Sequence, residues 1–230
     1  MSKKAVIISG GTLYEDLVLE TIQEEDSPCI IGVDKGVEFL YKHKIVPSYI
    51  VGDFDSLSEK IVEYYKNETH VSVREYNPVK DASDTEIAVR LAITLGCEKM
   101  VILGATGNRV DHLWANIQTL MIPFKAKVEA VILDPMNRIR LIGGETHLKK
   151  EEAFGTYFSV FPLGGTVYEL NIKGAKYPLA DHTLTPYDSL CVSNQIEEDE
   201  VVIDFSSGVV ILMETRDAYT KREESEEIDR

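Results

Sequence analysis

Hydrophobic and polar residues follow two different patterns along this chain, and the first covers residues 1–142. Short apolar runs there predict strands at 5–9, 29–33, 48–52, 70–74, 100–104 and 128–134. Amphipathic stretches between them predict helices at 13–24, 36–43, 58–66, after Ser83 and at about 111–121. Strands that alternate with helices of this length imply right-handed βαβ units. We therefore expect an α/β domain with a doubly wound, mostly parallel sheet at residues 1–142.

The second pattern begins beyond Gly143 and Gly144, where helical periodicity ends. Short β-rich runs, separated by Gly, Pro, Asp or Asn, predict strands at 157–163, 166–172, 189–193, 201–205 and 209–214. This spacing is typical of a small antiparallel β-sandwich or barrel, which we assign to a second domain at residues 143–230. The charged run at the end of the chain is typical of a solvated terminus.

Acidic residues outnumber basic ones, with 39 Asp and Glu against 24 Lys and Arg, so the formal net charge is −15. No Lys/Arg cluster is present to meet phosphates, which argues against non-specific binding to nucleic acid or to an anionic membrane. A phosphorylated substrate would need a metal ion or one or two well-placed basic residues.

Membrane insertion and export are not indicated either. No apolar run approaches the ~18 residues of a membrane helix, and MSKKAVIISGG predicts a first strand rather than a signal peptide. Three widely spaced cysteines, Cys29, Cys97 and Cys191, form neither a disulfide framework nor a zinc site. We expect reduced thiols and a cytoplasmic location.

The residues that carry chemistry follow the carboxyl ends of predicted strands, where open α/β sheets bind ligands. In strand order they are Asp34 and Gly36, then Asp53 and Asp55, then Asp81 and Asp84, then Gly104, Gly107, Arg109 and Asp111. This convergence predicts one ligand site at that edge of the sheet.

Two carboxylates, Asp53 and Asp55, lie in the segment GDFDS, directly after a buried strand. Mg²⁺ prefers oxygen ligands and often sits on one or two carboxylates plus substrate phosphates. The same segment also suits a simple turn in which Asp55 and Ser56 cap the next helix. It further resembles the DxD motif of haloacid-dehalogenase-type phosphatases, although Leu57 stands where Thr or Val is usual and the motif follows the third strand rather than the first.

The next segment contains Asp81 and Asp84, and Ser83 and Glu86 predict a capping box at a helix N-terminus. Asp84 in the first turn complements the helix dipole, which is a purely structural role. Its position at the same sheet edge as the other carboxylates favours a functional role as well.

The segment GATGNRVDH, residues 104–112, is a Gly-bounded loop that leads into a helix. Backbone N–H groups at a helix N-terminus suit an anion, and Arg109 adds a charged donor. The chain contains no GxxxxGK[ST] segment, so it is not a P-loop enzyme. Alternatively, Asp111 only caps the helix and His112 is a core histidine.

The same predicted helix continues through three further residues of interest. We expect Trp114 and Ile117 to lie in the core. Asn116, one turn beyond His112, is either a ligand contact or a buried tie to the neighbouring loop.

Together these segments resemble a known family. GDFDS, DASDTE and GATGNRVDHLWAN are similar, in order and spacing, to signature segments of the thiamine pyrophosphokinase family. The second half agrees through FPLGG at 161–165, KGAKYPLADHTL at 173–184 and CVSN at 191–194. From residue 34 to residue 194 the resemblance spans over two thirds of the chain. Two positions depart from the family pattern, because Ser83 stands where Thr is common and Lys35 where Gly often follows the aspartate.

The resemblance implies Mg²⁺-dependent transfer of a pyrophosphoryl group from ATP to the thiamine hydroxyl, which gives thiamine pyrophosphate and AMP. It implies an α/β nucleotide-binding domain, a thiamine-binding β-sandwich, and a homodimer that holds thiamine between the α/β domain of one subunit and the sandwich of the other. It also implies residue roles. Asp53, Asp55 and Asp84 would hold Mg²⁺ on the ATP phosphates with Asp81 close by, and Arg109 would bind phosphate. Asp111 and His112 would fix the loop that contains Arg109, and Asp34 and Gly36 would face the nucleotide. The thiamine pocket would be lined by Tyr177, Ser193 and Asn194.

Two other functions remain open from the sequence. A DxD phosphohydrolase would use Asp53 as a nucleophile, but it leaves the second half of the chain without a role. A non-catalytic sensor of nucleotide or thiamine would keep the fold without turnover. The full set of candidate carboxylates argues against such a loss of catalytic residues.

Overall fold

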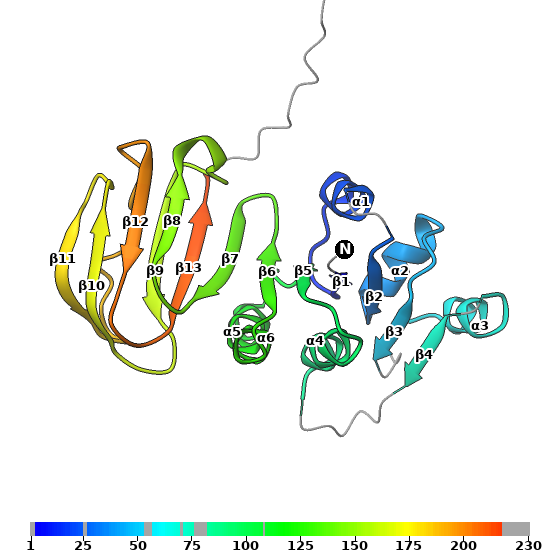
Figure 1. Cartoon of the computed structure of the whole chain (residues 1–230). Helices are drawn as coiled ribbons and strands as arrows, with labels where there is room; N and C mark the ends of the chain where they lie inside the picture. Colours follow the sequence, from blue (N-terminus) through cyan, green and yellow to red (C-terminus); the bar gives the residue numbers. More distant parts are fainter. Residues whose placement is uncertain are drawn as a thin grey trace, which may run out of the picture.

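The computed structural model describes residues 3–24, 27–52, 57–69, 71–75, 82–107 and 109–217, with side chains omitted at 73–75. Within these residues a nine-stranded sheet and a four-stranded sheet form the framework (Figure 1). The large sheet contains β1 (Lys4–Ile8), β2 (Cys29–Val33), β3 (Tyr49–Gly52), β4 (Ser72–Glu75), β5 (Lys99–Leu103), β6 (Glu129–Leu133), β7 (Asn137–Ile142), β9 (Tyr157–Pro162) and β13 (Val210–Thr215). The small sheet contains β8 (Thr146–Lys149), β10 (Val167–Lys173), β11 (Leu179–Leu184) and β12 (Glu200–Asp204).

The large sheet has the order β4-β3-β2-β1-β5-β6-β7-β13-β9. Pairings from β4 through β6 are parallel, and those of β7, β13 and β9 are antiparallel. The chain builds outward from β1 to β4 and then resumes on the other side of β1 with β5. This reversal makes the carboxyl ends of β1 and β5 the topological switch point, which is the usual ligand position in such sheets.

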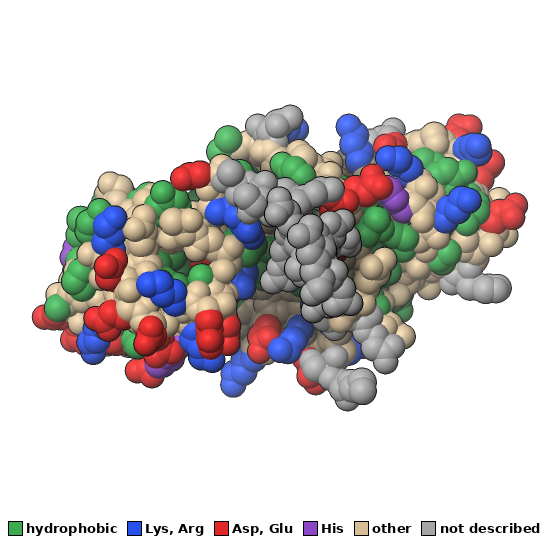
Figure 2. Space-filling model, turned by 90° about the horizontal axis from the view of Figure 1, so that it is seen from above, with side chains coloured by type: hydrophobic (Ala, Val, Ile, Leu, Met, Phe, Trp, Pro, Cys, Tyr) green, Lys and Arg blue, Asp and Glu red, His purple; other side chains and the backbone are tan. Residues whose placement is uncertain are grey.

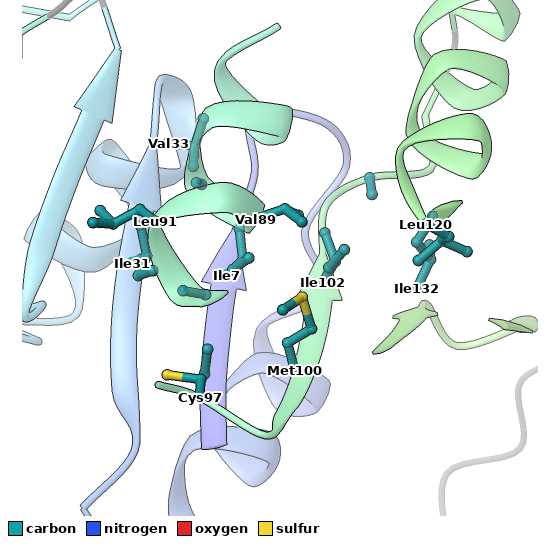
Figure 3. Packing of buried hydrophobic residues seen from close by; sticks show 14 of the residues in the cluster. Ile7, Ile31, Val33, Val89, Leu91, Cys97, Met100, Ile102, Leu120 and Ile132 are labelled. Atoms are coloured by element: carbon teal, nitrogen blue, oxygen red, sulfur yellow. The ribbon is translucent and has the colours of Figure 1, made fainter. Parts of the chain in front are cut away.

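Helices cover both faces of the parallel part, as a doubly wound sheet requires (Figure 1). They are α1 (Glu15–Gln23), α2 (Lys35–Lys42), α3 (Glu59–Asn67), α4 (Asp84–Thr94), α5 (Val110–Thr119) and α6 (Met121–Lys125). Because side chains alternate along a strand, Val6 and Ile8 of β1 pack toward α1 and α2, whereas Ile7 packs toward α4. Figure 3 shows the α4 side, where Val89 and Leu91 lie over the sheet beside Ile7.

The β-sandwich shares strands with the large sheet. Its core joins β7, β9 and β13 to the four-stranded sheet, with Leu212 and Phe158 on one layer and Leu170 and Ile203 on the other. All four side chains are 2 % exposed or less. Since the large sheet takes strands from both sides of residue 142, the division of the chain at 142/143 stays a prediction.

The helices and strands of the structure can be compared with those predicted from the sequence. The six strands expected before residue 142 are present to within two residues, and so are the expected helices, whereas α6, β7, β8 and β11 were not predicted. The strand expected at 189–193 is wrong. That segment forms no strand, and Ser193 in it has a φ of 57°. It contacts β9 through the Val160 N–H, which donates to the Cys191 carbonyl at 3.1 Å, and through the Ser193 N–H, which donates to Ser159 Oγ.

Figure 2 shows acidic and basic side chains interspersed over the face seen from above, with the protein as a whole at −15. No helix in the described part of the chain is both long and apolar enough to cross a membrane.

Candidate functional site

A pocket of about 700 Å³ opens at the switch point, and we call it the switch-point pocket. Its walls come from the loops after β1, β2 and β5 and from the first turns of α4 and α5. The lining residues are Ser9, Gly10, Gly11, Thr12, Asp34, Lys35, Asp84, Thr85, Gly104, Ala105, Thr106, Gly107, Arg109, His112 and Asn116. The carboxyl ends of three parallel strands thus meet in one place, as the sequence predicted.

The loops after β1 and β5 cross closely at the floor of this pocket. The Gly11 N–H donates to the Gly104 carbonyl at 2.9 Å, and Gly104 has a φ of +66°. A Cβ on Gly104 would lie 2.5 Å from the Ser9 carbonyl oxygen. Glycine is therefore required there, and backbone rather than side chains borders the ligand space.

The loop after β1, residues 9–12, is the part of the site that sequence reasoning missed. Its signal was present, because a Gly-Gly pair directly follows the strand next to the switch point. Without the strand order, nothing distinguished this turn from an ordinary one.

Helix α4 presents its N-terminus to the pocket. The Ser83 Oγ accepts from the Glu86 N–H at 3.2 Å, so the predicted cap is present. The Glu86 carboxylate, however, accepts from Arg90 Nε at 2.9 Å, which leaves the described capping box without its second half. Thr85 Oγ1 lies 3.0 Å from the buried Ser9 Oγ and ties α4 to the loop after β1.

Helix α2 begins at the pocket with a strained residue. Asp34 has φ 46° and ψ −124°, a region sparsely populated by residues other than glycine. Lys35 lines the pocket, and its side chain makes no hydrogen bond or ion pair with described residues. Gly36 is buried and is not among the residues that line the pocket. A Cβ at this position would collide with the Ile8 carbonyl oxygen. Its observed contact is the close packing of α2 on β1.

Helix α5 carries an exposed charge pair at the pocket rim. Arg109 Nε and Nη2 donate to the two carboxylate oxygens of Asp111 at 3.2 and 2.5 Å. This hydrogen bond raises the pKa of Arg109 and lowers the pKa of Asp111, so both stay charged. Asp111 lies in the first turn and Arg109 is the N-cap residue, so Asp111 does not cap the helix.

The rest of α5 divides between the pocket, the core and solvent. His112 is exposed and lines the pocket, so the interpretation as a core histidine is wrong. Trp114 is 50 % exposed, which contradicts the expected core position, whereas Ile117 is buried. Asn116 meets both expectations for it. It lines the pocket, and its buried Nδ2 donates to the Ala105 carbonyl at 2.8 Å.

The expected thiamine residues lie in the sandwich half and outside this pocket. Asn194 is 3 % exposed, and its side chain bonds both to the Tyr177 N–H, at 3.0 Å, and to the Tyr177 carbonyl, at 2.8 Å. The Ser193 N–H donates to Ser159 Oγ at 3.0 Å. Asn194 thereby joins the backbone at Tyr177 to the segment that contains Ser193.

Three of the expected carboxylates, Asp53, Asp55 and Asp81, lie outside the described residues. Within the described ranges no group of three His, Cys, Asp or Glu side chains is placed to hold a metal ion. Asp34 and Asp84 nevertheless bring two carboxylates to the wall of one pocket. Carboxylate oxygens of this kind fit Mg²⁺, which takes one or two of them and completes its shell with substrate phosphates and water.

Fold and site together define a doubly wound α/β protein with a pocket at the carboxyl edge of its parallel sheet, where proteins of this class bind their ligands. The start of α4 and two basic side chains, Lys35 and Arg109, line the pocket, and both features suit an anion. Comparison with known proteins makes this specific. Residues 22–132 match the family model "Thiamin pyrophosphokinase, catalytic domain", and residues 145–210 match "Thiamin pyrophosphokinase, vitamin B1 binding domain".

Relatives support the same assignment over nearly the whole chain. Thiamine pyrophosphokinase of Bacillus subtilis is 32 % identical over 217 residues, which cover 92 % of this chain and 98 % of that one. The crystal structure of the B. subtilis enzyme has a TM-score of 0.82 at 30 % identity and covers 94 % of this chain and 100 % of that chain. That of Geobacillus thermodenitrificans has a TM-score of 0.80 at 29 % identity, covering 94 % and 98 %. The chain belongs to the thiamine pyrophosphokinase family.

Proposed function

We propose that this protein transfers the pyrophosphoryl group of ATP to the hydroxyl of thiamine in a Mg²⁺-dependent reaction that gives thiamine pyrophosphate and AMP. One observation carries the proposal. The switch-point pocket combines backbone loops, Asp84, Lys35 and Arg109 in a chain that matches both halves of the family.

The residues divide the task by their chemistry. Asp84, with Asp53 and Asp55, would hold Mg²⁺, and Asp81 lies close by in the sequence; bound there, the ion would neutralise charge on the ATP phosphates. Arg109 donates to a phosphate when it turns from Asp111, and Lys35 supplies a second cation from the opposite loop. The thiamine hydroxyl attacks the β-phosphorus in line and AMP leaves, so catalysis consists mainly of positioning and charge neutralisation.

The nucleotide is held by the backbone as much as by side chains. The loops after β1 and β5 and the first turn of α4 line the pocket with backbone, and the N–H groups of a helix N-terminus suit phosphate oxygens. Asp34 and His112 line the same pocket, Gly36 packs behind it, and Asp111 holds Arg109 near the rim.

Thiamine binding is proposed at Tyr177, Ser193 and Asn194, where the exposed Tyr177 ring offers a face to a cationic ring. Exposed apolar side chains lie near both parts of the proposed site. Val110 and Trp114 lie on α5 beside the switch-point pocket, and Leu190 and Val192 lie on the loop before Ser193. Exposed apolar groups at two such places support a homodimer in which the two halves face each other across subunits.

The first test is product analysis of the purified protein with ATP, Mg²⁺ and thiamine, resolving AMP from ADP. We expect AMP and thiamine pyrophosphate in equal amounts. ADP with thiamine monophosphate would replace the reaction, and free phosphate independent of thiamine would favour the phosphohydrolase. Binding of both substrates without turnover would favour the sensor.

Variants locate the site. Asp53→Ala and Arg109→Ala should each cost several kcal/mol of transition-state stabilisation without unfolding the protein. Arg90→Gln removes another exposed, ion-paired arginine and should leave turnover unchanged. Near-normal turnover in both site variants would mean that the site lies elsewhere.

A mixing experiment tests the shared site. Arg109→Ala and Asn194→Ala proteins, each inactive alone, should regain up to about a quarter of wild-type activity after mixing and subunit exchange, because each heterodimer then has one intact site. No recovery after demonstrated exchange would place both halves in one subunit.

A cytoplasmic location accords with the three free, buried thiols.

A further inference from the structure

Two hydroxyl groups meet in the lining of the switch-point pocket, and the reaction proposed above gives them no task. Ser9 directly follows β1 and is 2 % exposed, and Thr85 lies in the first turn of α4. Their side-chain oxygens are 3.0 Å apart, and both residues line the pocket. We call these two side chains the hydroxyl pair.

The fold brings the hydroxyl pair to the middle of the site. Strand β1 lies between β2 and β5 in the large sheet, so Ser9 comes between the loop after β2 and the loop after β5. Helix α4 packs against β1 and β2, and this packing brings Thr85, next to Asp84 in the chain, to Ser9. The hydroxyl pair therefore lies centrally in the pocket, with charged side chains on the loops at either side.

The hydroxyl pair has one donor more than its internal bond uses. Each hydroxyl carries one proton and can also accept a hydrogen bond. One proton is shared between the two oxygens, and none of the described residues accepts the other. Because Ser9 is the more buried side chain, its O–H gains most from the internal bond, and this leaves the Thr85 O–H for the pocket.

Thr85 has a second such donor in its backbone N–H. It is the second residue of α4, so no carbonyl within the helix can accept from this N–H. The Ser83 cap accepts from the Glu86 N–H instead, and no residue in the described part of the chain accepts from the Thr85 N–H. A single residue thus offers two donors at the positive end of a helix dipole. They favour a ligand group that only accepts hydrogen bonds, and a phosphoryl oxygen is such a group.

We propose that Thr85, held in place by Ser9, binds the phosphates of the nucleotide, with its hydroxyl and its N–H donating to a phosphoryl oxygen. The inference rests on the proposed function and deepens it, because it assigns phosphate binding to an uncharged residue. Thr85 directly follows Asp84, so a phosphate bound there lies beside a carboxylate proposed for Mg²⁺. A neutral donor suits this position, because a cation there would compete with Mg²⁺ for the carboxylate.

The experiment measures binding rather than turnover, by calorimetry of the full-length protein with Mg²⁺ and without thiamine. The probes are ATP and inorganic tripolyphosphate. Thr85→Val keeps the side-chain volume and loses the hydroxyl, so both dissociation constants should rise about tenfold, the lower end of the effect of a hydrogen bond to a charged group. Thr85→Ser keeps the hydroxyl and should stay within about threefold of wild type. Ser9→Ala should weaken binding of both probes, and its addition to Thr85→Val should cause no further loss, because the two hydroxyls act as a unit.

Thr94→Val is the matched control and should bind both probes as wild type does, because Thr94 lies on the same helix and its hydroxyl donates to the Arg90 carbonyl. Thr85→Ala repeats the test if Thr85→Val does not fold. Wild-type affinity in the folded Thr85 variant overturns this inference and leaves the proposed function standing. A loss confined to ATP moves the contact to the nucleoside and overturns the assignment to phosphate. A wild-type protein that binds neither probe overturns this inference and the proposed function together.

Discussion

The hydrogen bond between Asn116 and Ala105 connects stability to the geometry of the site. Asn116 Nδ2 donates to the Ala105 carbonyl across 2.8 Å, and both residues are buried, at 8 % and 3 % exposed. Among the described residues no other donor reaches that carbonyl. Removing the carboxamide therefore leaves an unpaired buried acceptor beneath the loop after β5.

The loss of stability expected for Asn116→Ala can be calculated from that hydrogen bond. A typical hydrogen bond contributes about 1 kcal/mol net, but an unsatisfied buried group costs about 1–3 kcal/mol. With the small cavity added, Asn116→Ala should lower the free energy of unfolding by about 2–3 kcal/mol. Asn116→Asp keeps the side-chain volume and loses the donor, so an equal or larger loss would assign the effect to the hydrogen bond rather than to the cavity.

The assay is urea denaturation followed by circular dichroism, with Gln118→Ala as the matched control. Gln118 is exposed on the same helix and should change the free energy of unfolding by less than about 0.5 kcal/mol. In a thermal scan each kcal/mol should lower Tm by about 2–4 °C for a chain of this size. Because the loop borders the switch-point pocket, Asn116→Ala should also raise the KM for ATP more than that for thiamine.

An Asn116→Ala protein within about 0.5 kcal/mol of wild type would refute this reasoning, since a satisfied buried bond cannot be removed at so small a cost. A large loss of stability with an unchanged KM for ATP would separate the contact from the site.

The remaining predictions concern a helix cap, a glycine and two thiols. Ser83→Ala should destabilise the protein by about 1 kcal/mol in urea, because its hydroxyl caps α4. Gly36→Ala should cost at least about 2 kcal/mol or prevent folding, because the added methyl meets the backbone of β1. Burial raises the pKa of Cys97 and of Cys191 to about 11, so both thiols should resist alkylation at pH 8 in the native protein and react after denaturation.

The predictions for the cap and the glycine each have a control variant, and each of the three predictions has a result that would contradict it. Ser58→Ala serves for the cap, since the Ser58 side chain caps nothing at α3, and equal losses in the two serine variants would disprove the capping argument. In Gly144→Ala no atom of the described residues beyond the chain neighbours lies within 4 Å of the new methyl, so this variant should keep the stability of wild type. If Gly36→Ala is as stable as Gly144→Ala, the packing argument is wrong. Rapid native alkylation would show that the thiols are accessible.

Much of the site was predictable because its elements are local. Arg109 and Asp84 could be placed at the pocket from strand ends alone, since the carboxyl ends of parallel strands meet at one edge. Trp114 was placed wrongly, because residue type favours the core, whereas its position on α5 turns it to solvent. Asp53 and Asp55 remain predictions, as they lie outside the described residues.

The alternation of strands and helices before residue 142, the cap at Ser83 and the strand ends at which the pocket opens could all be derived from the sequence. These follow from periodicity and short-range hydrogen bonds, which a few neighbouring residues specify. That the loop at 9–12 belongs to the site, and that β7, β13 and β9 extend the parallel sheet, became clear only from the tertiary structure. Those results depend on which distant strands pair, and pairing is set by the burial of whole faces rather than by any local run of residues.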